Sequence, residues 1–285
     1  MQGIEGNAGE SQVREGIEYS YGKESVTDFV YSQGNDTIFK SYQQSYRIFL
    51  ELFKKSYPEY ADKMDVSDDD VRAARTKRFQ TDEYWMIWRQ YGEVVAFIEA
   101  FFHKQNGFNM LPRIFNKYPH EILNFQSTQA FFARFPSDAN LVTLFEDCGI
   151  TRMRWTMAET IWNAIYKLEI EYSGIVPRER WRLLKFNGLG RKISNMFLNL
   201  AFDIPEIGID VRVFRAACEL GLVPFEPEDF TSDSIKFEVE LILRRSIPKR
   251  FFLDADYLLF MRGAGENVHS PKPKVVKSAK QTIDR

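Results

Sequence analysis

The stretch FNGLGRKISNMFLNLAFDIPEIGIDVRVFR runs from Phe186 to Arg215 and combines two early glycines, a basic pair, a long apolar segment and a late aspartate. One helix that ends at Phe186 and another that begins at Arg191 would be joined by only four residues, NGLG. Glycines at 188 and 190 permit a sharp reversal and leave no side chain in the way of a close backbone approach. The stretch therefore predicts two helices joined by a tight turn.

Such a helix-hairpin-helix places unpaired amides at the start of its second helix. These amides and the helix dipole favour an anion, and Arg191 adds a cation beside them. A phosphate of a nucleic-acid backbone fits this description better than a base does. Glycine is also the usual residue in plain connections between helices, so the turn alone leaves the structural interpretation open.

The spacing of two ionisable residues adds specificity to this interpretation. Lys192 stands one residue into the second helix, and Asp210 follows eighteen residues later at a predicted N-cap of the segment VRVFRAACELGL. We expect an amine and a carboxylate to point from two helix starts toward one cleft. The alternatives are that Asp210 is only a helix cap and that Lys192 is only a solvated lysine or a phosphate contact.

The bulk composition limits the remaining choices. A chain of 285 residues can bury a full core as one large domain or two small modules. Its two cysteines, Cys148 and Cys218, are too few for a disulfide framework or a four-thiolate site, so we expect no iron-sulfur cluster, structural zinc or other cofactor. No apolar run is long enough to span a bilayer and the first residues do not form a signal peptide, which predicts a soluble intracellular protein.

The net charge of -2 does not by itself indicate a polyanionic partner. Between Arg152 and Arg215, however, eleven Lys or Arg residues stand against seven Asp or Glu residues. A basic face would therefore be local, although ordinary solvated helix surface gives the same count.

Apolar residues recur at three- and four-residue steps, and convincing alternating strands are absent, which predicts an all-α fold. We expect a long helix through 82–104 capped by Thr81, and we interpret the acidic run 65–71 as a linker. Helical spacing also suggests that Trp155, Trp162 and Trp181 are core residues rather than a stacking platform. The expected organisation is an N-terminal extension with an extra helix (1–80), a discontinuous helical subdomain (81–105 and 223–265), a helix-hairpin-helix subdomain (106–222) and a basic disordered tail (266–285).

With these motifs the sequence resembles the helix-hairpin-helix/Gly-Pro-Asp DNA glycosylases, and within them the endonuclease III branch. That branch has the pattern L-P-G-V-G-R-K-T-A, a helix, a proline-containing loop and V-D-T-H-V-F-R, where this chain has FNGLGRKIS and IDVRVFR at matching separation. The likeness covers about Thr81 to Gly265. It implies two helical subdomains with a DNA-binding cleft between them.

The sequence departs from the family pattern at three places. Asn187 stands where the family usually has proline, and Val211 and Arg212 replace the common Thr-His pair. The four cysteines that hold an iron-sulfur cluster in many relatives are missing after Gly265. Arg212 changes the charge beside the expected catalytic aspartate, so the accepted base cannot be carried over from any one branch.

The resemblance implies excision of a damaged or modified base from duplex DNA, with associated AP lyase activity. Lys192 would form a Schiff base and Asp210 would stabilise the sugar cation. The implied DNA contacts lie in the hairpin, in a duplex-probing residue at the end of the long helix and beside the catalytic aspartate: Asn187, Gly188, Leu189, Gly190, Arg191, Gln105 and Arg212.

Several alternatives stay open. Gln105 is either a wedge that fills the gap left by an extruded nucleotide or a simple polar helix terminus. The protein is a bifunctional glycosylase and lyase, a monofunctional glycosylase that leaves the strand intact, or a non-catalytic DNA-binding module. We expect a monomer without membrane contact, in the cytoplasm with the nucleoid or in the nucleus of a eukaryote.

Overall fold

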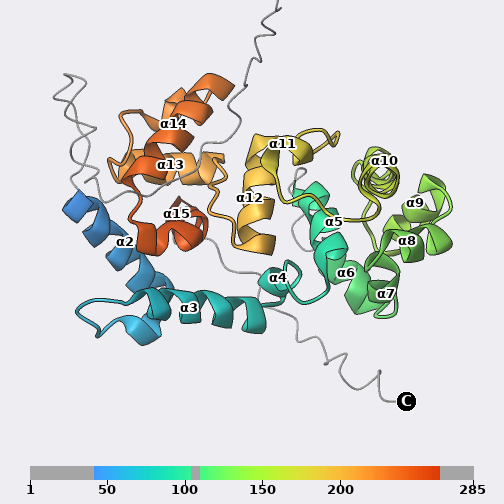
Figure 1. Ribbon diagram of the computed structural model, residues 1–285, viewed down its shortest axis with the longest axis horizontal. Helices are drawn as coiled ribbons and strands as arrows, with labels where there is room; N and C mark the ends of the chain where they lie inside the picture. The colour runs from blue at the N-terminus through green and yellow to red at the C-terminus, as the bar shows by residue number, and fades with distance from the viewer. Residues whose placement is uncertain (1–41, 104–109, 264–285) are drawn as a thin grey trace, which may run out of the picture. The chain divides into compact units, whose positions relative to one another are not determined.

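The computed structural model describes residues 42–103 and 110–263, and within these ranges the chain is helical with turns and no strand (Figure 1). The all-α prediction is confirmed. The α-helices are α2 Tyr42–Ser56, α3 Asp68–Thr81, α4 Glu83–Met86, α5 Glu93–His103, α6 Met110–Lys117, α7 Glu121–Phe125, α8 Thr128–Arg134, α9 Asp138–Asp147, α10 Arg154–Tyr172, α11 Arg180–Leu183, α12 Arg191–Phe202, α13 Val211–Glu219, α14 Asp233–Ser246 and α15 Ala255–Gly263. Three short 3-10 helices are η1 Pro58–Tyr60, η2 Pro227–Asp229 and η3 Lys249–Asp254.

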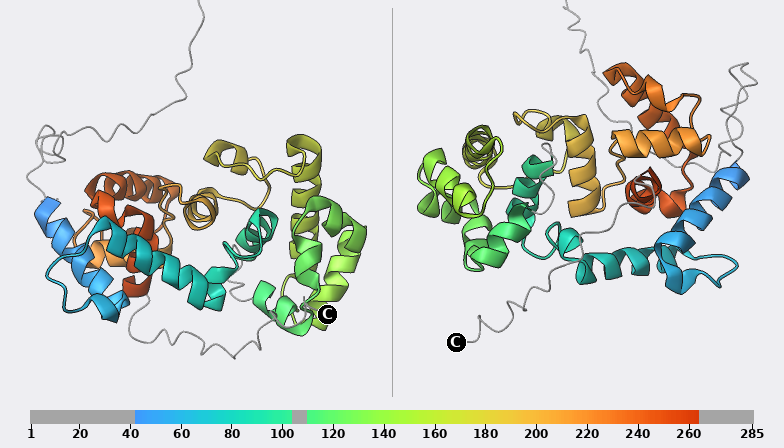
Figure 2. Two further views of the ribbon diagram at one scale, coloured as in Figure 1. Left: turned by 60° about the horizontal axis from the view of Figure 1, so that its bottom comes forward. Right: turned by 180° about the vertical axis from the view of Figure 1, so that it is seen from behind.

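The described helices form two hydrophobic cores within one unit, Thr37–Arg285 (Figure 1, Figure 2). Core 1 takes its buried side chains from Phe79 to Leu200, and α5 packs directly against α12. Core 2 takes them from α2, the first half of α3 and the chain from Ile207 to Leu259, with α13 packed against α15. Burial of aromatic and aliphatic side chains is the main stabilising contribution in both cores.

The two cores divide the chain differently from the expected subdomains. Helix α5, which we expected to pack with 223–265, contributes to core 1. Core 2 instead joins α2 and α3 to the helices after residue 206. The boundary between the cores therefore falls in the connection 203–210, directly before Asp210.

The expected long helix through 82–104 is wrong. Gly92 has a positive φ of 101°, and the chain turns there between α4 and α5. Thr81 ends α3, where its hydroxyl donates to the carbonyl of Lys77 at 2.8 Å, so it caps no following helix. The apolar pattern continued across the turn because both segments contribute to core 1.

The acidic run is the start of α3 rather than a linker. The Ser67 side chain accepts from the amide of Asp70, and the Asp70 carboxylate accepts from the amide of Ser67, which makes a reciprocal capping box. Asp68, Asp69 and Asp70 lie in the first turn, where negative charge is favoured by the helix dipole.

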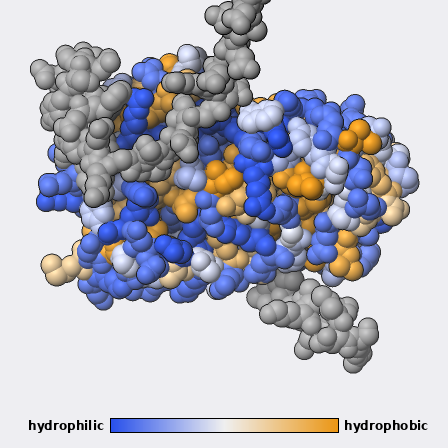
Figure 3. All heavy atoms as spheres, in the orientation of Figure 1, coloured by the Kyte–Doolittle hydropathy of each residue, from blue (hydrophilic) through white to orange (hydrophobic). Residues whose placement is uncertain are grey.

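The side chains of Trp155 and Trp181 are 58% and 50% exposed, so their assignment to the core was wrong. Trp162 is partly buried against core 1, and its indole donates to the carbonyl of Phe135. The face of the molecule in Figure 3 is mostly hydrophilic, with separate apolar patches. Among the described helices, none is both long and apolar enough to cross a bilayer.

Residues 1–41 of the N-terminal extension, Gln105 and the tail 266–285 lie outside the described residues. Their predictions stay predictions.

Candidate active site

The predicted hairpin is present between α11 and α12. Helix α11 covers only Arg180–Leu183, and the chain reverses where the amide of Leu189 donates to the carbonyl of Phe186. Gly188 has a φ of 105°, and a Cβ there would lie 2.9 Å from Thr160 and 3.1 Å from Phe101. Glycine is therefore required at 188 for both conformation and space.

Gly190 serves a different purpose. It is the N-cap of α12 with a φ of −81°, which any residue adopts, and a Cβ there would meet open space. Because glycine has no side chain to cap the helix, the first amides of α12 are not covered from this position. Asn187 is exposed beside them, whereas the Leu189 side chain is buried in core 1.

Arg191, predicted as a cation beside a phosphate, is held by a carboxylate. Its guanidinium contacts both oxygens of Glu240, at 2.6 and 3.0 Å, and lies over the ring of Phe237. Glu240 is buried and also pairs with Arg180 and Arg244. Arg191 therefore ties the hairpin to α14, and its contact with DNA stays a prediction.

Lys192 and Asp210 lie together, as their spacing predicted. The Nζ atom of Lys192 is 3.4 Å from Oδ2 of Asp210, and the two side chains are 38% and 17% exposed. Both groups are thus partly shielded yet reachable from solvent. They come from different cores, since α12 belongs to core 1 and α13 to core 2.

Asp210 uses its two oxygens differently. Oδ1 accepts from the amides of Arg212 and Val213, at 2.8 and 2.9 Å, and so caps α13. Oδ2 faces Lys192. The structural interpretation of Asp210 as a helix cap is therefore correct, and it leaves one oxygen for chemistry.

Two buried asparagines on α12 hold the connection that leads to Asp210. The side-chain amide of Asn195 donates to the carbonyl of Ile207 at 2.9 Å, and that of Asn199 donates to the carbonyl of Glu206 at 2.8 Å. The sequence analysis missed both. Their signal was two amide side chains four residues apart on one face of an otherwise apolar helix.

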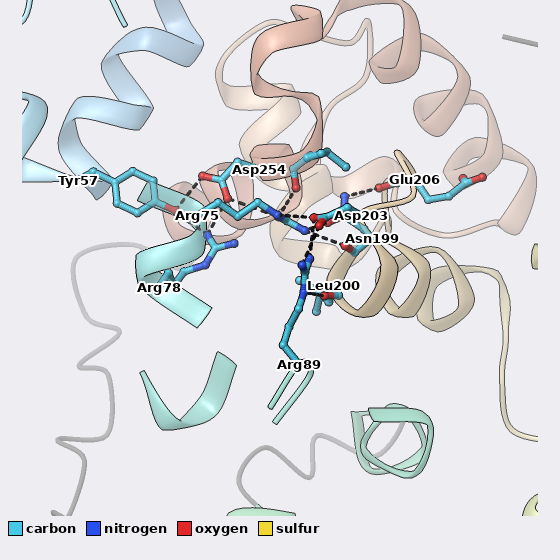
Figure 4. Close-up of polar contacts among 10 residues, drawn as sticks. Tyr57, Arg75, Arg78, Arg89, Asn199, Leu200, Asp203, Glu206 and Asp254 are labelled. Atoms are coloured by element: carbon cyan, nitrogen blue, oxygen red, sulfur yellow. Dashed lines mark hydrogen bonds and ion pairs between the residues drawn. The ribbon is translucent and has the colours of Figure 1, made fainter. Parts of the chain in front are cut away.

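A buried ionic cluster fixes the other end of α12 (Figure 4). Arg75 of α3 donates to both the backbone carbonyl and the side-chain oxygen of Asn199, at 2.7 and 2.8 Å, and to Asp203 at 3.0 Å. The guanidinium of Arg89 also pairs with Asp203. Figure 4 shows Arg75 between these groups and Asp254, so one side chain links the two cores.

Asp254 is the buried anion of this cluster. Its Oδ1 lies 2.8 Å from the guanidinium of Arg78, and its Oδ2 accepts from the hydroxyl of Tyr57 at 2.9 Å. A protein tolerates a fully buried charged side chain when that side chain is paired with an opposite charge and hydrogen-bonded. The hydrogen bonds of this cluster therefore fix the orientation of α3 against α12, in addition to the apolar packing of the two cores.

Arg212, the departure beside Asp210, contacts α15. Its guanidinium lies 4.8 Å from the ring centre of Phe260. The carbonyl of Arg212 also lies against Gly263, where a Cβ would overlap it. Arg212 donates its backbone amide to Asp210, whereas its guanidinium lies over the ring of Phe260.

The described residues hold no group of three or more His, Cys, Asp and Glu side chains that could bind a metal. An iron-sulfur cluster of the kind found in many relatives needs four thiolates, and the chain has two cysteines, in different cores. These residues do not fit such a cluster. A cavity of about 280 Å³ among α6, α7, α8 and α9 includes none of the predicted site residues.

Comparison with known proteins finds sequences similar to this chain among endonucleases III. The chain is 39% identical over 79 residues to endonuclease III of Bacillus subtilis (strain 168), which is 28% of this chain and 33% of that protein. It is 30% identical over 106 residues to endonuclease III of Escherichia coli (strain K12), which is 37% of this chain and 46% of that protein. The matches thus span between a third and a half of these relatives. No protein-family model matches the sequence.

A solved structure shares the fold. The structure described as a non-covalent endonuclease III–DNA complex superposes with a TM-score of 0.51 at 21% identity, covering 78% of this chain and 100% of that chain. The fold, the hairpin and the sequence matches agree with the resemblance found in the sequence. The chain is thus similar over part of its length to endonucleases III, and it shares the fold of this solved structure.

Proposed function

We propose that the protein is a DNA N-glycosylase with AP lyase activity that removes a damaged or modified base from duplex DNA. The observation that carries this proposal is the pairing of Lys192 Nζ with Asp210 Oδ2 at 3.4 Å, formed by the first turn of one helix and the N-cap of another. The relatives named endonuclease III and the DNA complex of the structural neighbour support it.

Asp210 would act on the sugar. Cleavage of the bond between a base and C1′ passes through an oxocarbenium-like sugar, and a fixed anion nearby lowers that barrier. Two backbone amides hold the carboxylate through Oδ1, so it needs little reorganisation during the reaction. Its second oxygen remains directed at the amine of Lys192 and the space beside it.

Lys192 would act as the nucleophile. After losing a proton, its amine attacks C1′, the bond from C1′ to the base breaks, and the base leaves with that electron pair and takes up a proton. Opening of the sugar ring gives a Schiff base. Loss of a proton from C2′ then expels the 3′-phosphate, which breaks the strand, and water releases the lysine. The Asp210 carboxylate is close enough to accept the proton from Lys192.

The hairpin would hold the DNA backbone. The turn 187–190 presents the exposed Asn187 and the first amides of α12, with the exposed Gly190 leaving open space for a phosphate. Arg191 would add its positive charge beside the phosphate and also fixes α12 through Glu240. Leu189 anchors the turn in core 1, so only its backbone faces a ligand.

The substrate base must leave the duplex stack before these groups can reach its sugar. We keep Gln105 as the proposed wedge, and Arg212 as a proposed contact at the mouth of the base pocket. Such an enzyme would work where the chromosome is, in the nucleoid or the nucleus, with damaged duplex DNA as its partner.

The test uses borohydride, which reduces a Schiff base to a stable protein–DNA adduct. Full-length protein is incubated with duplexes that carry an abasic site or one of a panel of oxidised, alkylated or hypermodified bases. We expect an adduct that Lys192→Gln abolishes. The matched control Lys77→Gln, which removes a lysine that is 63% exposed on α3, should trap like wild type.

Asp210→Asn sharpens the test because asparagine caps helices as well as aspartate does. We expect normal folding and DNA binding, with base release slowed by about a hundredfold or more. Base release without strand cleavage in wild type would identify a monofunctional glycosylase. DNA binding with no base release on any duplex, unaltered by Asp210→Asn, would identify a non-catalytic binding module.

A further inference from the structure

Asp256 of α15 contacts the connection that leads to Asp210. Both of its oxygens lie 3.0 Å from the amide nitrogen of Gly208, two residues before Asp210. Asp256 is only 9% exposed to solvent. It is therefore a buried carboxylate whose described hydrogen bonds go to a single backbone amide of the site.

Gly208 is also pressed against the helix that carries Lys192. A Cβ at 208 would lie 2.9 Å from the carbonyl oxygen of Lys192 and 3.3 Å from Cβ of Met196. The same Cβ would lie 3.6 Å from Oδ2 of Asp256, so Gly208 is packed closely against both the backbone of Lys192 and the Asp256 carboxylate. Any movement of Gly208 toward or away from α12 would change the distance between Lys192 and Asp210.

The contacts on the two sides of the connection come from different cores. Asn195 and Asn199 hold residues 206 and 207 from α12, on the side of core 1. Asp256 holds residue 208 from α15, on the side of core 2. Asp203 and Glu206 at the start of the connection also pair with arginines of other helices, but the described hydrogen bonds of the Gly208 amide go to Asp256 alone.

We propose that Asp256 is a positioning residue for the Lys192–Asp210 pair: by accepting from the Gly208 amide it fixes the connection between the two cores, and so the separation of amine and carboxylate. This inference rests on the proposed function for its catalytic consequence. Its geometric part, the anchoring of Gly208 by Asp256, is independent of any activity.

The surroundings of Asp256 make its charge sensitive to pH. Burial raises the pKa of Asp256 from 3.8 to about 7, the Gly208 amide opposes this, and the nearby carboxylates Asp210 and Glu240 add to it. Arg75 of α3 is the cation that lowers it. Helix α2, which also packs on α15, buries apolar side chains and Ser45 but no charged one.

The position of Asp256 next to Asp210 has a chemical consequence. Burial, and to a lesser extent the negative charge of Asp210, raise the pKa of Asp256 to about 7. Asp256 can therefore take up a proton near neutral pH.

The variants for the test differ in what they keep. Asp256→Asn keeps an oxygen that can accept from Gly208 but removes the charge, whereas Asp256→Ala removes the acceptor. Asp69→Asn makes the same charge change at a side chain that is 91% exposed on α3, and it serves as the control. All variants are made in the full chain.

The first measurement follows the amide resonance of Gly208 by NMR from pH 5 to 9. We expect a shift with a midpoint near pH 7 in wild type and in Asp69→Asn, and none in Asp256→Asn. An identical position and pH dependence in wild type and Asp256→Asn would overturn the proposal. This measurement needs no DNA, so it also decides the case if Asp256→Ala fails to fold.

The second measurement is the rate of borohydride trapping on abasic duplex DNA. We expect Asp256→Ala to lower the maximal single-turnover trapping rate by about tenfold to a hundredfold, with the protein concentration that gives half of this rate within about twofold, and Asp256→Asn to recover most of the loss. A wild-type rate in folded Asp256→Ala would refute the positioning role. If wild type itself forms no adduct, the proposed function fails, and the Gly208 resonance alone decides whether Asp256 anchors the connection.

Discussion

Replacing Gly208 by alanine tests the packing that brings the two cores together at the site. The added Cβ would lie 2.9 Å from the carbonyl oxygen of Lys192, about 0.5 Å short of the 3.4 Å at which ordinary contact begins. The neighbour is backbone, so it cannot rotate away as a side chain can. The backbone conformation at 208 does not require glycine, and the effect would be purely steric.

The expected magnitude follows from this overlap. Overpacking of this kind lowers the free energy of unfolding by about 1–3 kcal/mol. Relief of the overlap moves residue 208 away from α12, and Asp210 follows two residues later. Because a misplacement of 1 Å can cost about a hundredfold in rate, a shift of half that size should slow borohydride trapping on the order of tenfold.

Gly190→Ala is the matched control. Its Cβ would meet no atom within 4 Å, and its φ of −81° suits alanine, so the free energy of unfolding should fall by less than about 1 kcal/mol. Its methyl group would instead lie on the hairpin and weaken DNA binding. Urea unfolding and single-turnover trapping measure the two effects. Equal stability of Gly208→Ala and Gly190→Ala, with a wild-type trapping rate for Gly208→Ala, would refute the reasoning.

Three further predictions concern stability. Asp254→Asn leaves Arg78 and its neighbours without a buried counter-charge and should lower the free energy of unfolding in urea by about 3–5 kcal/mol; a loss below about 1 kcal/mol would contradict this. Ser67→Ala removes one half of the capping box with Asp70 and should cost about 1 kcal/mol, whereas no loss would show that the box is not needed. The pKa of Asp256 is raised from 3.8 to about 7, so between about pH 4 and 7 the folded chain keeps a proton that the unfolded chain has released. The contribution of Asp256 to the free energy of unfolding therefore falls as pH rises across that window, by up to about 4 kcal/mol. Asp256→Asn should remove this dependence of the unfolding free energy on pH, as measured by urea unfolding at several pH values in the window.

The sequence predicted those parts of the fold that depend on local signals. The hairpin, the start of α12 at Arg191 and the N-cap at Asp210 each follow from a residue type at one position. The errors came from signals that need tertiary context. The apolar content of 82–104 indicated burial correctly, but not that Gly92 would interrupt the helix. The run 65–71 was recognised as acidic, but its role as the start of α3 depends on the reciprocal hydrogen bonds between Ser67 and Asp70.

The residues that hold the site together could not be predicted in the same way. Arg75 reaches α12 across a sequence separation of 124 residues, and Asp256 reaches Gly208 across 48. In the sequence both look like ordinary charged residues of helices. Their role depends on burial, because a charged group without solvent must take its hydrogen bonds from whichever backbone lies beside it.

The departures from the family pattern fall on side chains that the Lys192–Asp210 pair does not use. The Asp210 carboxylate caps α13 by accepting from the backbone amides of residues 212 and 213. Any residue other than proline supplies such an amide. Exchange of Thr-His for Val211 and Arg212 therefore leaves the carboxylate in place, because the contact does not depend on those side chains. The side chain of Arg212 packs on Phe260 instead. Under the proposed function, the effect of Arg212 should consequently appear in which base is accepted, because the proposed step at the sugar relies on the amine and the carboxylate, which lie 3.4 Å apart.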